Sequence, residues 1–209
     1  TVNTYVKRIF SKLGVHSRVE RVARMAGTDG LGSTDGRVAY DEEGDLAQLQ
    51  AWRNEPRLRR YFREYRELNA TQQRAWFDSK VNGDPATRMF AIVERTTNRL
   101  LGACGLCYID WVNRTADFSI YIGADDLYID ATFAPDAARA MVDYGFDELG
   151  LNRLWTELYE FDDRKIRFFA ELGFTQDGRF RQTHWAEGRW HDSVYFSLLA
   201  SDPRSGTSP

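Results

Sequence analysis

Polar side chains that can move protons alternate with apolar ones along residues 115–123, which read "TADFSIYIG". Strict alternation predicts a half-buried β-strand, because successive side chains of a strand point to opposite faces. Asp117, Ser119 and Tyr121 then share one face. A carboxylate in such a position is a candidate for accepting a proton from a substrate. The plainer interpretation is that Asp117 lies at a strand end and holds Arg114 or a backbone group.

An arginine-rich and aromatic stretch, residues 56–69, is the second candidate for chemistry. Its cationic and aromatic residues are Arg57, Arg59, Arg60, Arg63, Arg66, Tyr61, Phe62 and Tyr65. Arginine and aromatic side chains together suit a substrate that carries a phosphate, a carboxylate or a sugar ring. The alternative is a solvent-exposed helix whose arginines pair with Glu64 and Glu67. The sequence leaves both interpretations open.

Cys104 and Cys107 form a C-x-x-C motif inside residues 100–111, which read as a strand. No second half-site accompanies the motif, so its spacing does not predict a metal site. A redox pair would open a helix, whereas a strand places the two sulfurs on opposite faces. We therefore expect both cysteines to pack in the core, and we predict no metal site.

Two histidines, His184 and His191, flank a predicted terminal hairpin together with Trp185 and Trp190. They are candidates for lining a substrate pocket, and His184 is a candidate base near neutral pH. Aromatic residues of hairpins more often form cross-strand packing pairs, and packing is the favoured interpretation. Asp192 is expected to fix the hairpin.

The elements that must position these residues follow from changes in hydrophobic period along the chain. Predicted helices cover residues 45–54, 69–81, 135–149 and 162–172, with Asn69 or Thr71 as a cap, Pro135 at a first helical position and Gly173 as a stop. Predicted strands cover residues 89–95, 100–111, 115–123 and 152–160, followed by the hairpin of residues 174–185 and 189–199. This order predicts a mixed α/β sheet, not a doubly wound parallel one.

Composition and charge bound the class of protein. The 209 residues are 43% hydrophobic and 14% aromatic, which fits a folded domain. A net charge of −3 neither supports nor excludes a charged partner. No apolar run approaches the about 20 residues that cross a bilayer, and the start shows no signal-peptide pattern, so we expect a soluble protein without a membrane partner. Two cysteines fit a reducing, cytoplasmic compartment.

Several stretches within residues 37–199 resemble the GCN5-related N-acetyltransferase (GNAT) superfamily, and most of all its branch of ribosomal-protein and amino-sugar acetyltransferases. These stretches are "WRNEPRLRRYF", "IDWVNRTADFSIYIG", "GLNRLWTELYEFDDRKIRFFAELGF" and the closing hairpin. The resemblance implies an α+β fold whose central, mostly antiparallel sheet has splayed strands flanked by helices. It also implies that acetyl-CoA binds between the splayed strands. Its acetyl group would pass to a primary amine of a small molecule, such as an amino-sugar nucleotide, or to a protein N-terminus.

The same resemblance places the diphosphate of acetyl-CoA on backbone N–H groups at the start of the helix around Pro135. On this basis the residues expected to bind acetyl-CoA are Ile122, Ile129, Asp130, Thr132, Phe133, Ala134, Asp136, Asp162 and Lys165. Of the glycine-rich pattern that similar proteins carry here, only Ala134 fits, because Ile129 and Thr132 replace its other positions. Side chains narrow the approach of a phosphate, but the free amides do not depend on them. Binding is therefore expected to be weakened or reshaped, not lost.

The catalytic roles also come from the resemblance. Asp117 matches the position at which similar proteins often carry a glutamate, and it is the expected base. Phe169 stands where they often carry a tyrosine that protonates the leaving thiolate, so Tyr121 and Tyr159 become the candidate acids. Two further positions have changed: Asp162 replaces an asparagine, and Lys165 replaces an alanine and is expected to reach a CoA phosphate. The amine acceptor is expected to contact Trp52, Arg53, Arg63, Tyr65 and His184.

The altered motif leaves a second function open, a GNAT-shaped binding or regulatory module without transfer activity. Residues 1–26 have a helical period, with Gly14 ending one helix and Ser17 capping the next, and they resemble the second half of a LuxR-type helix-turn-helix. A DNA-linked regulator is therefore a third hypothesis, although two helices alone are not expected to bind DNA. A homodimer contact is the alternative use of their apolar face. Residues 27–36 read as a flexible linker and residues 200–209 as a loose tail.

Overall fold

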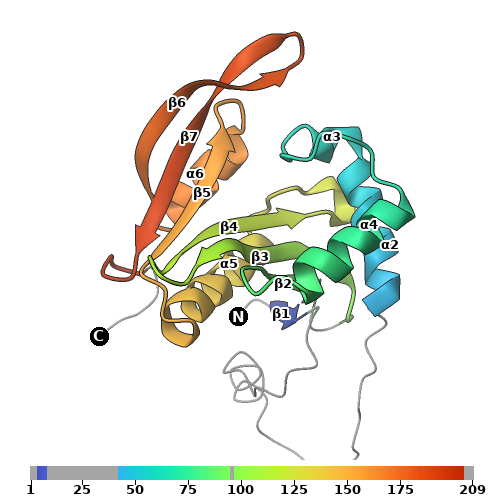
Figure 1. Cartoon of the computed structure of the whole chain (residues 1–209), viewed down its shortest axis with the longest axis horizontal. Helices are drawn as coiled ribbons and strands as arrows, with labels where there is room; N and C mark the ends of the chain where they lie inside the picture. Colours follow the sequence, from blue (N-terminus) through green and yellow to red (C-terminus); the bar gives the residue numbers. More distant parts are fainter. Residues whose placement is uncertain (1–3, 9–41, 95–96, 205–209) are drawn as a thin grey trace, which may run out of the picture.

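A single mixed sheet organises the chain, and the computed structural model describes residues 4–8, 42–94 and 97–204 (Figure 1). The sheet has seven strands in the order β1-β2-β3-β4-β5-β7-β6. The strands are β1 (Thr4–Arg8), β2 (Arg88–Glu94), β3 (Leu100–Asp110), β4 (Thr115–Ile122), β5 (Arg153–Tyr159), β6 (Thr175–Ala186) and β7 (Arg189–Leu199). All neighbours pair antiparallel except β4 and β5, which pair parallel. The predicted mixed sheet is confirmed.

The parallel pair at the centre of the sheet separates along its length. Only Thr115–Asp117 of β4 pair with Arg153–Trp155 of β5, although the strands have eight and seven residues. Beyond Asp117 each strand keeps its other neighbour, β3 or β7, and the two halves of the sheet diverge (Figure 1). The predicted splayed strands are therefore confirmed, and the opening between them is the space available for a ligand.

Helices cover both faces of the sheet. They are α2 (Glu42–Asn54), α3 (Pro56–Arg59), α4 (Ala70–Trp76), α5 (Phe133–Asp143) and α6 (Asp163–Glu171), with the π-helical turns η1 (Phe77–Asn82) and η3 (Tyr144–Glu148) and the short 3₁₀ turn η2 (Ala124–Asp126). Phe118, Ile120 and Ile122 pack into one core with α5 and α6, whereas Tyr121 packs into a second core with residues of α2, α3 and η1. The alternation predicted for residues 115–123 is confirmed.

The stretch of residues 56–69 was expected to be helical, and this expectation is wrong beyond Arg59, where α3 ends. Side chains of α2 hold the rest as a loop: Asn54 donates from Nδ2 to the carbonyl of Leu68 (2.8 Å) and accepts from its N–H (2.8 Å). Gln50 Nε2 donates to the same carbonyl (2.6 Å). These bonds satisfy backbone groups that a helix would otherwise pair. The first helical residue of α4 follows Asn69, which forms the predicted cap with Gln72.

Helix α5 begins at Phe133, so Pro135 is its third residue and not the predicted first. The earlier start is possible because Asp130 accepts hydrogen bonds from the N–H groups that open the helix, including that of Ala134 (2.8 Å). Helix α6 follows Asp162. Gly173, with φ of +94°, lies just after the end of this helix, as predicted for its stop.

Residues 1–26 were expected to be helical, but Thr4–Arg8 form strand β1, which pairs antiparallel with β2. The edge of β2 offers unpaired backbone groups, and an added strand satisfies them, so tertiary pairing outweighs the local helical period. The remaining predicted helices, with Gly14 and Ser17, and the linker at residues 27–36 lie outside the described residues. In the predicted tail, Arg204 pairs with Asp147 (2.9 Å).

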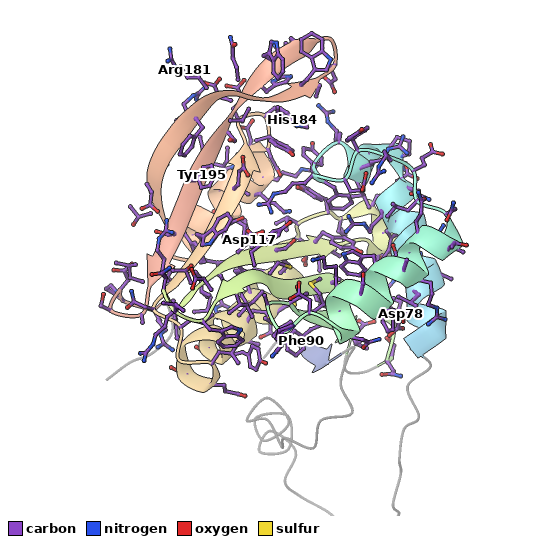
Figure 2. All side chains as sticks on the ribbon, viewed as in Figure 1. Asp78, Phe90, Asp117, Arg181, His184 and Tyr195 are labelled. Atoms are coloured by element: carbon purple, nitrogen blue, oxygen red, sulfur yellow. The ribbon has the colours of Figure 1, made fainter. Side chains whose placement is uncertain are left out.

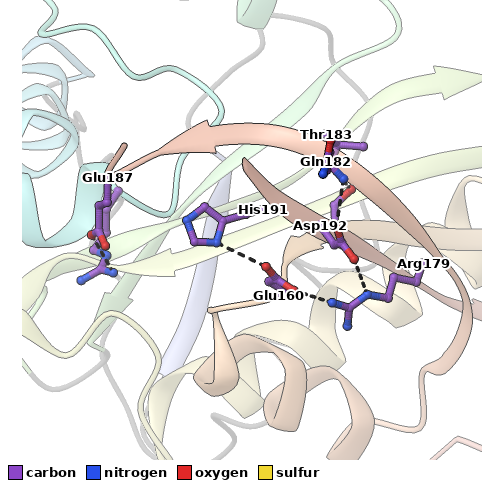
Figure 3. A network of polar contacts seen from close by, with 9 residues as sticks. Glu160, Arg179, Gln182, Thr183, Glu187, His191 and Asp192 are labelled. Atoms are coloured by element: carbon purple, nitrogen blue, oxygen red, sulfur yellow. Dashed lines mark hydrogen bonds and ion pairs between the residues drawn. The ribbon is translucent and has the colours of Figure 1, made fainter. Parts of the chain in front are cut away.

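The terminal hairpin of β6 and β7 projects beyond the rest of the sheet (Figure 1). It turns at Glu187 and Gly188, both with positive φ, and its tip pairs Trp185 edge-on with Trp190 (5.2 Å). Cross-strand packing of these tryptophans is thereby confirmed. Asp192 accepts from Arg179 Nε (2.6 Å) and from the N–H of Gln182 (2.9 Å), so it fixes the hairpin as predicted (Figure 3).

Helix α2 lies close to the end of β4, where Trp52 packs against the backbone of Gly123. Gly123 follows β4 directly, and a Cβ at this residue would lie 2.1 Å from Cδ2 of Trp52. Trp52 is partly buried and packs against both cores. Glycine is therefore required here for lack of space, since its φ is −92°.

Candidate active site

A cavity of about 320 Å³ lies where β4 and β5 diverge. Its walls come from β4, β5, the start of α6, the loop after α3, and α4 with η1 and β3. The lining residues used below are Arg53, Arg63, Glu64, Lys80, Asp84, Asp117, Glu157, Tyr159, Asp162 and Lys165. A space of this size holds the reacting ends of two small substrates.

Asp117 lies at the last paired position of β4, opposite Trp155, where the strands begin to separate. Its side chain is 4% exposed, and Arg63 Nη1 donates to Oδ2 at 2.7 Å. Arg63 also approaches Glu157 of β5 (Nε to Oε2, 3.8 Å), so its guanidinium spans the two strands. Within the described part of the chain, Oδ1 of Asp117 takes no hydrogen bond. Figure 2 shows Asp117 in the opening between the two halves of the sheet.

Burial raises the pKa of the Asp117 carboxyl, and the attraction of Arg63 opposes that rise. A carboxylate whose pKa is raised toward neutrality is a better proton acceptor than an exposed one. Arg63 thus holds Asp117 through Oδ2, while Asp117 lines the cavity.

The start of α6 forms the opposite wall. Asp162, 3% exposed, accepts the N–H of Lys165 on Oδ1 (3.2 Å) and the hydroxyl of Tyr128 on Oδ2 (2.5 Å). Tyr128 comes from the loop before α5 and stacks on Tyr61 at 4.4 Å. The Tyr128–Asp162 bond thus joins the β4 half of the molecule to the β5 half across the opening.

Lys165 is 8% exposed and lines the cavity. Its Nζ lies 5.1 Å from the centre of the Tyr128 ring, and no hydrogen bond or ion pair to Nζ occurs among the residues the structure describes. Burial lowers the pKa of this amine, against the attraction of Asp162 and Asp117. A buried ammonium without a partner is costly, so its presence in a cavity indicates a role with a ligand.

The start of α5 is the place where the diphosphate of acetyl-CoA was expected. Here the N–H groups of Thr132 and Phe133 donate to Asp130 Oδ2 (2.7 Å each), and the N–H of Ala134 donates to Oδ1 (2.8 Å). A carboxylate of the chain therefore occupies the donors that would hold a phosphate. The amides expected to bind the diphosphate of acetyl-CoA are therefore already bound by Asp130.

The structure brings six of the predicted site residues to the cavity: Asp117, Tyr159, Asp162, Lys165, Arg53 and Arg63. His184 lies just behind the wall, with its ring 3.8 Å from that of Tyr159. These residues come from five separate elements, and the divergence of β4 and β5 gives them a common space.

The other predicted site residues lie away from the cavity wall. Tyr121 and Ile122 are buried in the two cores, and burial raises the pKa of Tyr121 to about 12. Trp52 covers Gly123, and Tyr65 is 75% exposed. At the start of α5, Ile129, Asp130, Thr132, Phe133, Ala134 and Asp136 surround the capped amides.

Sequence reasoning missed two residues of the site. Glu157 lies two positions before Tyr159 on β5, so the same alternation that placed Tyr159 could have placed it. Tyr128 gave no signal, because its partner Asp162 is 34 residues away. The cysteines lie on opposite faces of β3, as predicted, and Cys104 is in the core. The prediction that both pack in the core is wrong for Cys107, which is half-buried, lines the cavity and lies 3.7 Å from the sulfur of Met89.

The described residues lack two kinds of feature. No group of three or more histidine, cysteine, aspartate or glutamate residues in that part of the chain is arranged to hold a metal ion. None of its helices is long and apolar enough to cross a membrane.

Comparisons with known proteins agree with this geometry. Residues 38–175 match the protein-family model described as "Acetyltransferase (GNAT) domain". The uncharacterized N-acetyltransferase p20 of Bacillus licheniformis is 32% identical over 110 residues, which cover 53% of this chain and 61% of that protein. The chain thus spans less than two thirds of the length of this relative.

Two further similarities concern a spermidine acetyltransferase. The spermidine N(1)-acetyltransferase of Vibrio cholerae is 24% identical over 160 residues, which cover 77% of this chain and 90% of that protein. A crystal structure of spermidine N-acetyltransferase from Vibrio cholerae with CoA and spermine superposes with a TM-score of 0.70 at 22% identity, covering 76% of this chain and 92% of that one. At this identity the superposition supports the fold.

Proposed function

Because the chain belongs to the GNAT acetyltransferase family, whose co-substrate is acetyl-CoA, we propose that it transfers an acetyl group from acetyl-CoA to a primary amine of a small molecule. The amine and the thioester meet in the cavity between β4 and β5. Asp117 accepts the proton that the amine must lose before it attacks, since a protonated amine is not a nucleophile.

One observation supports this assignment above all others: Asp117 lines the cavity, and Arg63 binds its Oδ2, while Oδ1 takes no hydrogen bond from any described residue. A carboxylate placed only to neutralise an arginine is expected to be closed off from ligands. Here the ion pair orients the carboxylate at the point where the strands separate, and its raised pKa suits proton transfer.

The cavity's charges bear on the acceptor. Five carboxylates and four cationic side chains line it: Glu64, Asp84, Asp117, Glu157 and Asp162, with Arg53, Arg63, Lys80 and Lys165. Such a balance suits an amine that also carries an anionic or polar group, such as an amino-sugar nucleotide, better than a polyamine with several positive charges. Spermidine, the substrate named for the Vibrio cholerae relative, and a protein N-terminus are the other acceptors to compare.

The test is release of free CoA thiol with a panel of amines: an amino-sugar nucleotide, spermidine and a short peptide with a free N-terminus. With an accepted amine, Asp117→Asn should lower kcat about 100-fold, the scale of general-base catalysis, while calorimetry shows an acetyl-CoA affinity within twofold of wild type. Asp125→Asn, a change of the same kind at an exposed residue paired with Arg99, is the matched control. Wild-type protein that neither binds acetyl-CoA nor releases thiol with any of the three amines would refute the proposal.

Self-association is a separate part of the proposal. A spermidine N-acetyltransferase from Vibrio cholerae has a dodecameric structure, and it superposes on this chain with a TM-score of 0.63. We expect this chain also to form a homo-oligomer, at least a dimer. Sedimentation velocity measures this directly, and a monomer at tens of micromolar protein would contradict it.

A further inference from the structure

The proposed reaction lacks a proton donor for its leaving group. When the C–S bond of the thioester breaks, the sulfur departs as a thiolate, and a nearby acid speeds this step. Phe169 occupies the position at which similar proteins often carry a tyrosine for this purpose, and it is fully buried among aromatic rings of the core. The chain must use another group or none.

Lys165 lies one helical turn before Phe169 on the same face of α6, because residues four apart are neighbours on a helix. Its side chain is more than nine-tenths buried and lines the cavity. Nζ contacts the Tyr128 ring but has no hydrogen bond or ion pair in the part of the chain that the structure describes. We propose that the Lys165 ammonium is the acid that protonates the departing thiolate. This inference rests on the proposed function and adds a catalytic residue to it.

The hydroxyl groups of Tyr128 and Tyr159 are less suited to the task. The hydroxyl of Tyr128 already donates to Asp162 at 2.5 Å, and burial raises its pKa well above the usual value. Burial also raises the pKa of Tyr159, one of the two candidate acids from the sequence. A thiol has a pKa near 8.5, so an amine whose pKa falls from about 10.4 toward that value is the better matched donor.

The charged and titratable groups around Nζ come from every wall of the cavity. They are Asp162 and Arg164 of α6, Asp117 of β4, Glu157 and Tyr159 of β5, Tyr128 of the loop before α5, and Arg63 of the loop after α3. Asp162 and Asp117 favour the ammonium form, whereas burial and Arg63 favour the neutral amine. Burial is the largest of these effects, so the ammonium releases its proton more readily than that of an exposed lysine.

The step balances as follows. Asp117 removes one proton from the acceptor ammonium, and the neutral amine attacks the thioester carbonyl. A C–N bond forms, the C–S bond breaks, and the electron pair of that bond leaves on sulfur. Lys165 gives its proton to the sulfur, and the second proton of the attacking nitrogen returns Lys165 to the ammonium form. The overall reaction releases one proton, which Asp117 passes to solvent.

Kinetics of three variants test the role. Lys165→Met keeps the length of the side chain without the amine, and Lys165→Arg keeps the charge but cannot donate near neutral pH. Both should lower kcat about 100-fold with KM for acetyl-CoA within threefold of wild type. Arg167→Met, which removes one charge from an exposed position of α6, is the matched control and should keep wild-type kcat. The wild-type kcat should also fall at high pH, and Lys165→Met should lack this limb.

A second measurement needs no turnover. The chain has four lysines, Lys7, Lys12, Lys80 and Lys165, so NMR of ¹³Cε-labelled lysine gives few signals to resolve. The signal absent from Lys165→Met should titrate clearly below about 10.4, the ordinary value for lysine, and should shift when CoA is added. The other three lysine signals persist in Lys165→Met and serve as internal references.

Two outcomes would overturn the inference while the proposed function stands. If Lys165→Arg keeps kcat within threefold of wild type, or if Lys165→Met raises only KM, Lys165 binds an anion and does not donate a proton. If Tyr159→Phe loses kcat about 100-fold while Lys165→Met does not, Tyr159 is the acid. An ordinary titration of the Lys165 signal would also reject the role. Loss of thiol release in wild type itself would instead refute the proposed function.

Discussion

The starts of α5 and α6 differ in which of their polar groups remain without a hydrogen bond among the described residues. Each helix has an aspartate just before it, Asp130 for α5 and Asp162 for α6. Asp130 is half-buried and satisfies three successive N–H groups of α5. Asp162 is buried and accepts one N–H of α6 and the hydroxyl of Tyr128. The ammonium of Lys165 lies against the Tyr128 ring and forms no hydrogen bond or ion pair with any described residue.

This difference shows where a ligand has something to add. At α5 the local chain has met its own hydrogen-bonding needs, so an incoming phosphate must displace a carboxylate. At α6 the buried ammonium of Lys165 could still bind an anion or give up its proton to a ligand. Helix α5, where an anion site was expected, is capped by Asp130 of the same chain. Helix α6 instead carries Lys165, whose ammonium has no hydrogen bond or ion pair among the described residues. Four predictions test this difference between α5 and α6.

Asp162→Ala should have the largest effect, because it removes the residue that joins the two halves. The variant loses the cap of α6 and strands the buried hydroxyl of Tyr128, so the free energy of unfolding should fall by about 3 kcal/mol. Urea unfolding measures this. A loss as small as that of Tyr128→Phe, about 1 kcal/mol, would mean that the cap of α6 contributes nothing beyond the tyrosine bond.

Lys165→Met should act in the opposite direction on stability. Replacing a buried, unpaired ammonium with an apolar side chain of similar length removes a desolvation penalty, so the free energy of unfolding should rise by about 1–2 kcal/mol at pH 7. Arg167→Met, at an exposed site on the same helix, should change it by less than about 0.5 kcal/mol. A destabilised Lys165→Met would show that the amine has a structural partner after all.

Asp130→Ala should separate stability from affinity at α5. Loss of the cap should lower the free energy of unfolding by about 1 kcal/mol. The freed amides, and the removal of a competing negative charge, should strengthen acetyl-CoA binding about tenfold by calorimetry, which corresponds to about 1.4 kcal/mol.

Two companions identify the cause of that gain. Asp130→Asn retains a capping side chain without the charge, so it should fall between wild type and Asp130→Ala. Asp125→Ala removes the same charge from an exposed site and should leave affinity unchanged. Weaker binding by Asp130→Ala would mean that the carboxylate shapes the loop for acetyl-CoA and does not compete with it.

The pH dependence of stability gives the smallest effect. Burial raises the pKa of Asp162 in the folded protein above the value of about 3.9 expected in the unfolded chain. The folded state therefore binds this proton more tightly, and the stability contributed by Asp162 falls as pH rises through the folded pKa. Relative to Asp162→Asn, wild type should lose stability between pH 4 and pH 7 in urea unfolding. A constant difference would show that the pKa of Asp162 is not raised.

The sequence predicted most of the fold because its signals are local. Alternation along residues 115–123 placed Phe118 and Tyr121 in opposite cores, and the cap at Asn69 and the stop at Gly173 lie where expected. Strand β1 escaped prediction because its partner lies about 85 residues away, and pairing across such a separation leaves no periodic signal. The loop after α3 escaped because Leu68 is held by Asn54 of another helix.

The site was harder to predict than the fold. Asp117, Arg63 and Lys165 could each be named, but their common cavity exists only because β4 and β5 diverge beyond Asp117. Asp130 could have been identified as a cap, since an aspartate three residues before an apolar helix is a local pattern. The resemblance concerned the missing glycines, and these give no information about Asp130, whose carboxylate binds the amides at the start of α5.

The contact between Trp52 and Gly123 means that the residues at these two positions must change together. Because the indole rests on the backbone, any side chain at position 123 demands a smaller residue at position 52. A library randomised at both codons should return compensated pairs and very few single replacements. The same pairing of residue types at the two positions would identify other chains that place helix α2 in this way.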